Sequence, residues 1–237
     1  MKFLLKKKSE PTQSVVPYVL VHPARARRVT LKVEHPNQVI ISAPKKTPIE
    51  LINKFVNDHQ QWIQDQLERL KTSHNLIESS DQIMIFGKKL SKIYSNSLEQ
   101  EQGVYISNSA LIINYPSSTS AKTVEKEIRL FLKKAARTYL YKQTPNLANI
   151  MGLSYNSLTL REQKSRWGSC SGKDNLNLNW RLVHYPPAVI NYVIIHELAH
   201  LVHHNHSKNF WSLVAKHDPD YKIHRTYLKK YGVTNYD

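Results

Sequence analysis

The chain has 237 residues, 41% of them hydrophobic and 22% charged; this composition is typical of a globular protein and excludes disorder over most of the length. No run approaches the ~18 consecutive apolar residues of a membrane-spanning helix, so we expect no membrane span. The formal charge of +16 favours anionic partners. We expect a cytoplasmic location, because the chain has a single cysteine and its first residues contain too short an apolar run for a secretory signal.

The first part of the chain is predicted to be rich in strands. Residues 1–14 are charged and contain proline but show no periodicity, so we expect a flexible tail. Apolar and polar residues alternate over 18–43, which predicts strands joined by a turn at 35–38. Apolar residues then recur at helical spacing over about 48–70, which predicts one helix, or two helices with a break near His59.

The remaining elements predict an α+β fold. Short strand-like runs fill residues 82–115, and a proline- and serine-rich linker follows them. A helix is predicted over 121–141, and further strands are predicted at 156–162 and 176–183. We therefore expect a β-rich N-terminal region over residues 15–116 and a more helical C-terminal domain over residues 117–237.

One motif carries recognisable chemistry. Pro187 can begin a helix of mostly apolar residues, and this helix ends in His196-Glu197-Leu-Ala-His200. Histidines four residues apart share one face of a helix, so their imidazoles can hold one metal ion. Glu197 is next to the first histidine and can act as a general base toward a water at that metal. The pattern predicts a zinc-dependent hydrolase.

A third ligand is expected where the chain turns back after this helix. Asn205 is a plausible helix C-cap, and His206 directly follows it. His203 and His204 compete for the same role, although His204 lies a further turn away along the helix. Ser207 could then cap a helix beginning at Lys208. Three histidines with an open position for water are typical of a catalytic rather than a structural zinc site.

Other polar residues are candidates for substrate contacts. Arg166, in the string Arg166-Trp-Gly-Ser-Cys, could hold a carboxylate or phosphate, or the string could be a turn with a buried tryptophan. Tyr221 and Arg225 follow the metal-binding segment and could stabilise charge in the transition state, or could serve as a cap and a surface ion pair. Cys170 is more often structural than nucleophilic in such a context.

The sequence resembles the YgjP-like metallopeptidase domain family. The resemblance is carried by residues 159–171, residues 178–183, the His196–His200 helix, and Asn205-His206-Ser207 with Phe210-Trp211. It implies a cytoplasmic bacterial protein of the gluzincin-like zinc peptidases, related to SprT-like proteins. It also implies a zincin-like domain over 117–237, one Zn²⁺ bound by His196, His200 and His206, and Glu197 as the catalytic base, with the motif helix packed against a small sheet.

Three functions follow as hypotheses. The leading one is a metallopeptidase, whose extended substrate would pair with an edge strand near residues 156–162. The second is a nucleoside triphosphate pyrophosphatase acting on UTP at the same metal site, because the family also carries that label. The third is a non-enzymatic nucleic-acid-binding protein with structural zinc, since residues 1–60 hold 11 basic and four acidic groups, a surplus of seven.

Overall fold

The computed structural model describes residues 16–34, 38–77, 79, 81–163 and 166–231, and the predicted tail at 1–14 and most of the predicted turn at 35–38 lie outside them. By internal contacts the chain divides into two compact units, Met1–Thr72 and Ser73–Asp237. In the part of the chain that the structure describes, no helix has both the length and the apolar character needed to cross a membrane.

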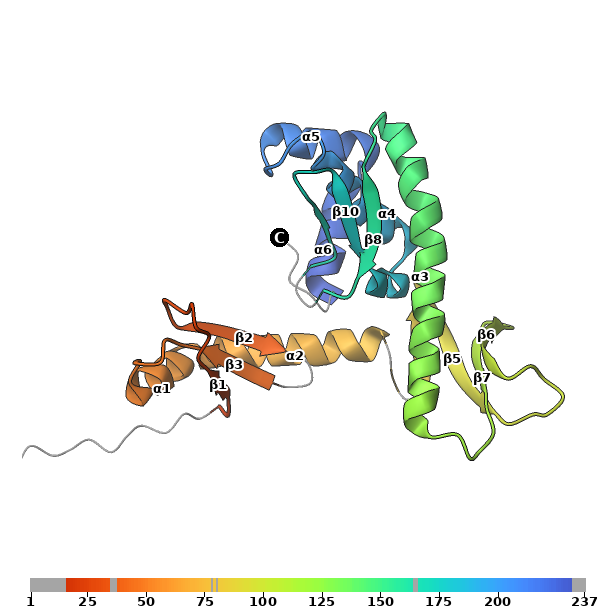
Figure 1. Ribbon diagram of the computed structural model, residues 1–237, viewed down its shortest axis with the longest axis horizontal. Helices are drawn as coiled ribbons and strands as arrows, with labels where there is room; N and C mark the ends of the chain where they lie inside the picture. The colour runs from red at the N-terminus through yellow and green to blue at the C-terminus, as the bar shows by residue number, and fades with distance from the viewer. Residues whose placement is uncertain (1–15, 35–37, 78, 80, 164–165, 232–237) are drawn as a thin grey trace, which may run out of the picture. The chain divides into compact units, whose positions relative to one another are not determined.

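The first unit is a small sheet with helices (Figure 1). Its three strands, in the spatial order β1-β3-β2, pair with β1 parallel and β2 antiparallel to β3. The predicted helical break is confirmed at His59, whose φ of −108° leaves the helical range. Ile41, Ile52 and Val56 are almost fully buried between the sheet and the helices. The elements are β1 (Val19–Val21), β2 (Thr30–Glu34), β3 (Gln38–Ser42), α1 (Ile49–Asp58) and α2 (Gln60–Ile77), and the unit boundary at Thr72 falls within α2.

The second unit begins with a four-stranded sheet in the order β4-β5-β7-β6. Its strands are β4 (Gln82–Ile85), β5 (Lys88–Ser95), β6 (Gly103–Ser107) and β7 (Ala110–Asn114). Gly87 joins β4 to β5 at a φ of +75°, and a side chain there would lie 2.9 Å from Pro186. The Phe86 N–H donates to the carbonyl of Val183 at 2.7 Å. This turn therefore rests on the segment that leads into the motif helix.

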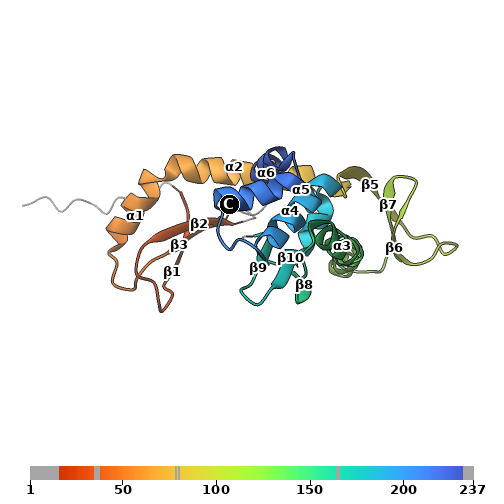
Figure 2. The same ribbon diagram turned by 90° about the horizontal axis from the view of Figure 1, so that it is seen from above.

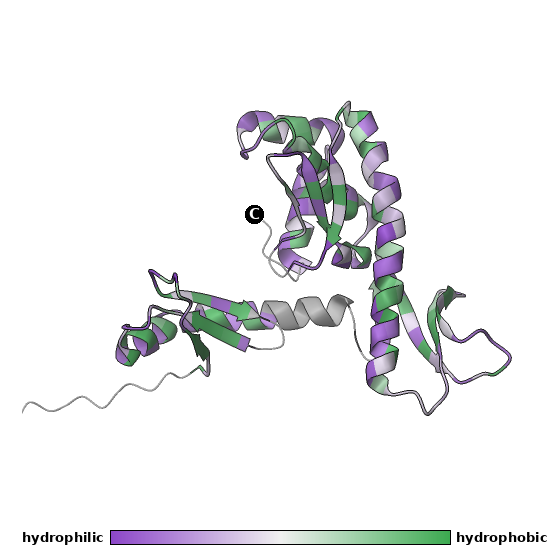
Figure 3. Cartoon of the chain, in the orientation of Figure 1, coloured by the Kyte–Doolittle hydropathy of each residue, from purple (hydrophilic) through white to green (hydrophobic). Residues whose placement is uncertain are grey.

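Helix α3 (Ala121–Met151) is ten residues longer than predicted. It begins at Ser120, whose hydroxyl accepts the Thr123 N–H, and continues through Pro145 to Gly152. The sequence-based prediction that this helix ends at residue 141 is wrong, because the buried stripe continues beyond the proline with Leu147 and packing there offsets the lost backbone hydrogen bond. Figure 3 shows hydrophobic and hydrophilic positions alternating along α3.

A second sheet has the order β8-β10-β9, with β8 parallel and β9 antiparallel to β10. Its strands are β8 (Ser157–Arg161), β9 (Gly168–Cys170) and β10 (Asn175–Asn179). The strand predicted over 176–183 is shorter than expected, since a 3₁₀ helix, η1 (Trp180–His184), follows β10 directly. Strand β9 was not predicted, because three residues are too few to show an alternating pattern.

The centre of this unit is α4 (Pro187–Ala199), with Pro187 in its first turn as predicted. It is followed by α5 (Lys208–His217) and α6 (Tyr221–Tyr231). Helix α4 packs against α3, α5 and α6 and against β9 and β10, so residues from Val189 to Ala199 are buried apart from Asn191. In Figure 2, α4 lies between α5 and the strands β9 and β10. The α+β class, with the motif helix packed on a small sheet, is confirmed.

The contact-based division differs in position from the sequence-based one. Residues of β4–β7, which the sequence grouped with the N-terminal region, share one hydrophobic core with α3 and α4, so the boundary between compact units falls at Thr72. The extent of the functional domain, predicted as 117–237, stays a prediction.

Candidate metal centre

Helix α4 carries two polar side chains into an otherwise apolar interior. His196 and Glu197 are each 3% exposed, although their helix neighbours Ile194, Ile195 and Leu198 are hydrophobic. Burying ionisable groups in this way costs free energy unless they have partners, so such groups mark a candidate functional site.

Three histidines converge at the end of this helix. Nitrogen atoms of His196, His200 and His206, one from each ring, all lie within 4.8 Å of one another. The Nε2 atoms of His196 and His206 are 3.1 Å apart. Within the described ranges, His203 and His204 are in no such group. The structure thus brings together the three residues favoured by sequence.

The turn that returns His206 to the site differs from the predicted one. Helix α4 ends at Ala199, and His200 takes the C-cap position that the sequence assigned to Asn205. The Asn205 side chain instead accepts the Ser207 N–H at 3.3 Å, in the turn before α5. The prediction of Asn205 as a helix cap is therefore wrong, because the chain leaves the helix five residues earlier. The Ser207 cap is confirmed: its hydroxyl accepts the Phe210 N–H at 3.5 Å.

A backbone carbonyl fixes which nitrogen of His200 faces the site. Nδ1 of His200 lies 3.0 Å from the carbonyl oxygen of His203. A carbonyl can only accept, so Nδ1 carries the proton and Nε2 presents its lone pair. Metal-binding histidines commonly have such a second hydrogen bond, which orients the ring.

Burial favours the neutral form of two of the three rings. It lowers the pKa of His196 to about 2, with smaller contributions from His200, His206 and Arg225. Burial also lowers the pKa of His200. Only a neutral imidazole can ligate a metal. The spacing of one pair fits zinc: two ligands at 2.0–2.1 Å on a tetrahedral ion are about 3.3 Å apart, close to the 3.1 Å between the Nε2 atoms of His196 and His206.

Helix α5 supplies an aromatic wall around the histidines. The fully buried Phe210 ring lies 4.6–4.9 Å, centroid to centroid, from His196, His200 and His206. Trp211 stacks on His206 with centroids 5.6 Å apart. These contacts leave the rings little freedom to turn away from one another.

Two of the predicted substrate-contact residues lie on this wall. Tyr221 stacks on Trp211 at 5.3 Å, and the Arg225 guanidinium lies 4.8 Å from the centre of the same indole. Among the described residues the Arg225 Nε is buried without a hydrogen-bond partner. Trp211 therefore links both residues to His206.

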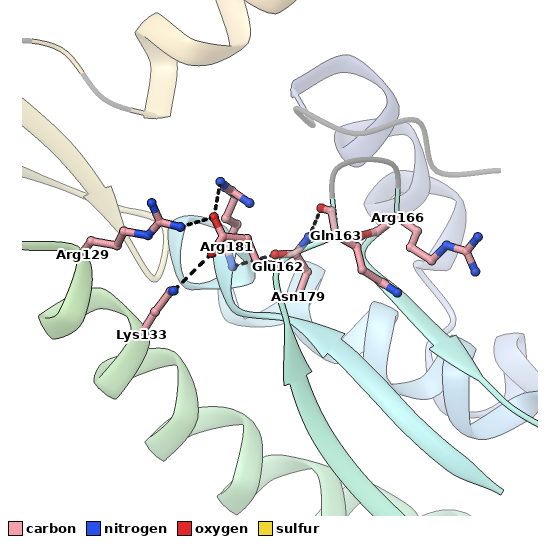
Figure 4. Close-up of polar contacts among 7 residues, drawn as sticks. All are labelled: Arg129, Lys133, Glu162, Gln163, Arg166, Asn179 and Arg181. Atoms are coloured by element: carbon pink, nitrogen blue, oxygen red, sulfur yellow. Dashed lines mark hydrogen bonds and ion pairs between the residues drawn. The ribbon is translucent and has the colours of Figure 1, made fainter. Parts of the chain in front are cut away.

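Arg166 is placed differently. Its side chain is exposed and points away from the polar cluster around Glu162 in Figure 4, and its backbone carbonyl accepts a hydrogen bond from Asn179. No described contact links its guanidinium to the three histidines. The buried Trp167, with its edge against Tyr185 at 4.9 Å, favours the interpretation of this string as a turn with a packed tryptophan.

Cys170 has the properties of a structural cysteine. Burial first, and then the charges of Glu197 and Asp174, raise the pKa of its thiol to about 11. The thiol is therefore protonated at neutral pH, which opposes a nucleophilic role.

Sequence reasoning did not assign three further residues to the surroundings of the site. Tyr192 is buried with its ring centroid 6.0 Å from that of His196, and its spacing of four residues before His196 on the same helix could have indicated this. His224 pairs with Asp218 at 2.9 Å, and its ring lies 6.4 Å from Tyr192. No sequence pattern indicated that pair, because it joins the end of α5 to α6.

The connection from β8 to β9 is anchored at both ends (Figure 4). At its start, Glu162 accepts from Arg129 and from Arg181, and pairs with Lys133 at 3.1 Å. Burial raises the pKa of Glu162, but hydrogen bonds from Arg129 and Lys133 and the nearby charges outweigh it and lower the value to about 2. Asn179 Nδ2 donates to the carbonyl of Gln163 near the start of the connection at 2.8 Å and to that of Arg166 near its end at 3.1 Å.

Comparison with known proteins gave one family and two solved structures. The family model described as YgjP-like, metallopeptidase domain, matches residues 27–231. The metallopeptidase zymogen abylysin of Pyrococcus abyssi is 22% identical with a TM-score of 0.35, over 41% of this chain and 99% of that one. The zymogen jannalysin of Methanocaldococcus jannaschii is 22% identical with a TM-score of 0.33, over 38% and 95% respectively. No curated protein matched the chain.

Proposed function

The chain belongs to the YgjP-like metallopeptidase domain family, and from that premise we propose that it is a zinc-dependent peptidase with Glu197 as its general base. The observation that carries the proposal is the convergence of three histidine rings at the end of α4, the helix that also carries the buried Glu197. Such a set leaves one coordination position for water, as catalytic rather than structural sites do.

His196, His200 and His206 would hold the ion. Bound zinc supplies a Lewis acid and lowers the pKa of a water at its open position to about 7. The carbonyl of His203 holds the His200 ring in the tautomer that a ligand needs, and Phe210 packs against all three rings.

Glu197 would move the protons of the reaction. As water adds to the scissile carbonyl carbon, a carboxylate oxygen of Glu197 takes one proton of that water. When the carbon–nitrogen bond breaks, the same carboxyl gives the proton to the departing amine, so no proton is gained or lost overall. The position of Glu197 directly after His196 supports this role, because it keeps base and ligand on one turn.

Arg225 is our choice for stabilising the negative charge that develops on the carbonyl oxygen. Its guanidinium lies over Trp211, which itself stacks on His206, and its buried Nε has no partner among the described residues. A half-buried cation with an unused Nε–H donor is suited to an oxyanion. Tyr221, which also stacks on Trp211, could add a hydroxyl donor.

An extended peptide would pair with β9. The described part of this strand pairs with β10 on one side, and it is the strand of this sheet that packs most closely on α4 beside Glu197. The sequence placed the substrate edge at residues 156–162, but β8 lies at the opposite edge of the sheet. Backbone pairing to an edge strand gives affinity with little dependence on side chains.

The test is peptide cleavage by zinc-loaded protein, read by mass spectrometry on an unfolded-protein substrate. Glu197→Gln should keep its zinc and lose at least about 100-fold in rate, within the range for a general base. Glu125→Gln, which changes an exposed carboxylate of α3, is the matched control and should keep full activity. A Glu197→Gln protein with full activity would refute the proposal. UTP in parallel reactions tests the alternative of nucleotide hydrolysis at the same site.

A further inference from the structure

Gly168, the first residue of β9, lies directly against the Glu197 side chain. A Cβ added at Gly168 would be 2.5 Å from Oε1, 2.6 Å from Cγ and 2.7 Å from Cδ of Glu197. All three separations are far below the 3.5–4.0 Å of a favourable contact between heavy atoms. The glycine therefore leaves the volume that the carboxyl group occupies.

Space, and not backbone conformation, is what requires glycine here. Gly87, Gly103 and Gly152 have positive φ, whereas Gly168 does not. Its backbone is that of an ordinary strand residue paired with Leu178 of β10. Alanine would cause no backbone strain at such a position, and by reducing the freedom of the unfolded chain it would on its own stabilise the fold slightly.

The backbone of Gly168 is held firmly on its other sides. The preceding Trp167 is fully buried against Tyr185, and its carbonyl accepts the Asn179 N–H at 2.7 Å. The Asn179 side chain, also fully buried, donates to the carbonyl of Arg166. An added methyl group at Gly168 could not be relieved by moving this strand, so the Glu197 carboxyl would have to move instead.

We propose that Gly168 is a positioning residue that sets the place of the Glu197 carboxyl group beside the three histidines. The inference rests on the proposed function for its catalytic consequence, but the contact itself can be tested without turnover. The inference also gives the segment Arg166–Cys170 a role in which Gly168 matters, and not an Arg166 contact with substrate.

The first experiment is a thermal double-mutant cycle on metal-free full-length protein. Gly168→Ala should lower Tm by about 2–10 °C, because overpacking a closed site is destabilising. In a Glu197→Ala background, where the clashing atoms are gone, the same substitution should leave Tm unchanged or slightly higher. Gly172→Ala is the matched control, since a Cβ there meets nothing within 4 Å and its φ is not positive.

The second experiment is kinetic and uses the zinc-loaded protein. Displacing a base by about 1 Å costs on the order of 100-fold, so Gly168→Ala should lower kcat about 100-fold with KM and zinc content unchanged. In a Glu197→Gln background the substitution should cause no further loss, because the positioned group is already inactive.

The two experiments separate failure of the inference from failure of the proposed function. Equal Tm losses from Gly168→Ala with and without the Glu197 side chain would overturn the inference, as would an unchanged kcat. If the wild-type protein cleaves no peptide, the thermal cycle still decides whether the contact exists. Should Gly168→Ala fail to fold, folding of the Gly168→Ala/Glu197→Ala protein supports the inference and its failure to fold overturns it.

Discussion

The substitution Asn179→Asp tests whether the Asn179 side chain holds the connection between β8 and β9 in place. The Asn179 side chain is fully buried, and its amide donates to the carbonyls of Gln163 and Arg166 at 2.8 and 3.1 Å. Aspartate has nearly the same shape as asparagine, but an oxygen replaces the NH₂ group. This oxygen can only accept hydrogen bonds, so neither carbonyl keeps its donor.

The expected cost follows from the two lost hydrogen bonds. Each contributes about 1 kcal/mol net, and a buried acceptor left without a donor adds about 1–3 kcal/mol, so the free energy of unfolding should fall by about 3–5 kcal/mol. For a unit of this size that corresponds to a fall in Tm of about 6–20 °C. The backbone amide of Arg181, which donates to Asn179 Oδ1 at 3.2 Å, keeps its acceptor in the variant.

Urea denaturation followed by tryptophan fluorescence measures this cost, because Trp167, Trp180 and Trp211 all lie in the second unit. Asn177→Asp on the same strand is the matched control. Its Oδ1 accepts from Arg161, which aspartate preserves, and the hydroxyl of Ser169 can turn to donate to the new oxygen. The control should change stability by no more than about 0.5 kcal/mol. Equal losses of stability in Asn179→Asp and Asn177→Asp would refute the idea that the Asn179 hydrogen bonds hold the connection.

The remaining predictions concern two ionisable side chains. Glu162→Gln should destabilise the protein by about 1 kcal/mol at pH 7, less than its pKa shift alone would give because the partners are solvent-exposed. The pKa of Glu162 is about 2 in the folded protein and 4.5 in the unfolded chain. In urea titrations the stability difference between Glu162→Gln and wild type should therefore persist above pH 4.5 and shrink as the pH falls toward 2. A stability difference that stays constant over this range would contradict the lowered pKa of Glu162. Cys170 should react with a maleimide at pH 8 about 100-fold more slowly than a free cysteine thiol with its ordinary pKa of 9.0, because a pKa of about 11 leaves that much less thiolate; reaction at the rate of an exposed thiol would contradict its burial.

The metal-binding segment could be predicted from sequence because its signals are local. Histidines four residues apart on a helix face one way whatever surrounds them, and Ser207 caps α5 within its own turn. The end of α4 could not be placed this way. His200 leaves the helix because packing and the carbonyl of His203 favour the turn, while Asn205 looked like a better cap on propensity alone.

The parts that sequence missed depend on tertiary packing. Helix α3 continues past Pro145 because Leu147 has a core to enter, which no local pattern reveals. Strand β9 exists because β10 offers a partner, and so the closeness of Gly168 to Glu197 was hidden too. Propensity is a weak guide wherever tertiary contacts decide between alternatives.

The metal content of purified protein tests the central claim most directly. Wild-type protein dialysed against zinc should retain one equivalent by elemental analysis, and His206→Ala should retain far less, because it loses one of three ligands. His204→Ala is the matched control, since this exposed histidine lies two residues away and outside the cluster. It should bind zinc like the wild type. Loss of zinc in His204→Ala with retention in His206→Ala would contradict the account.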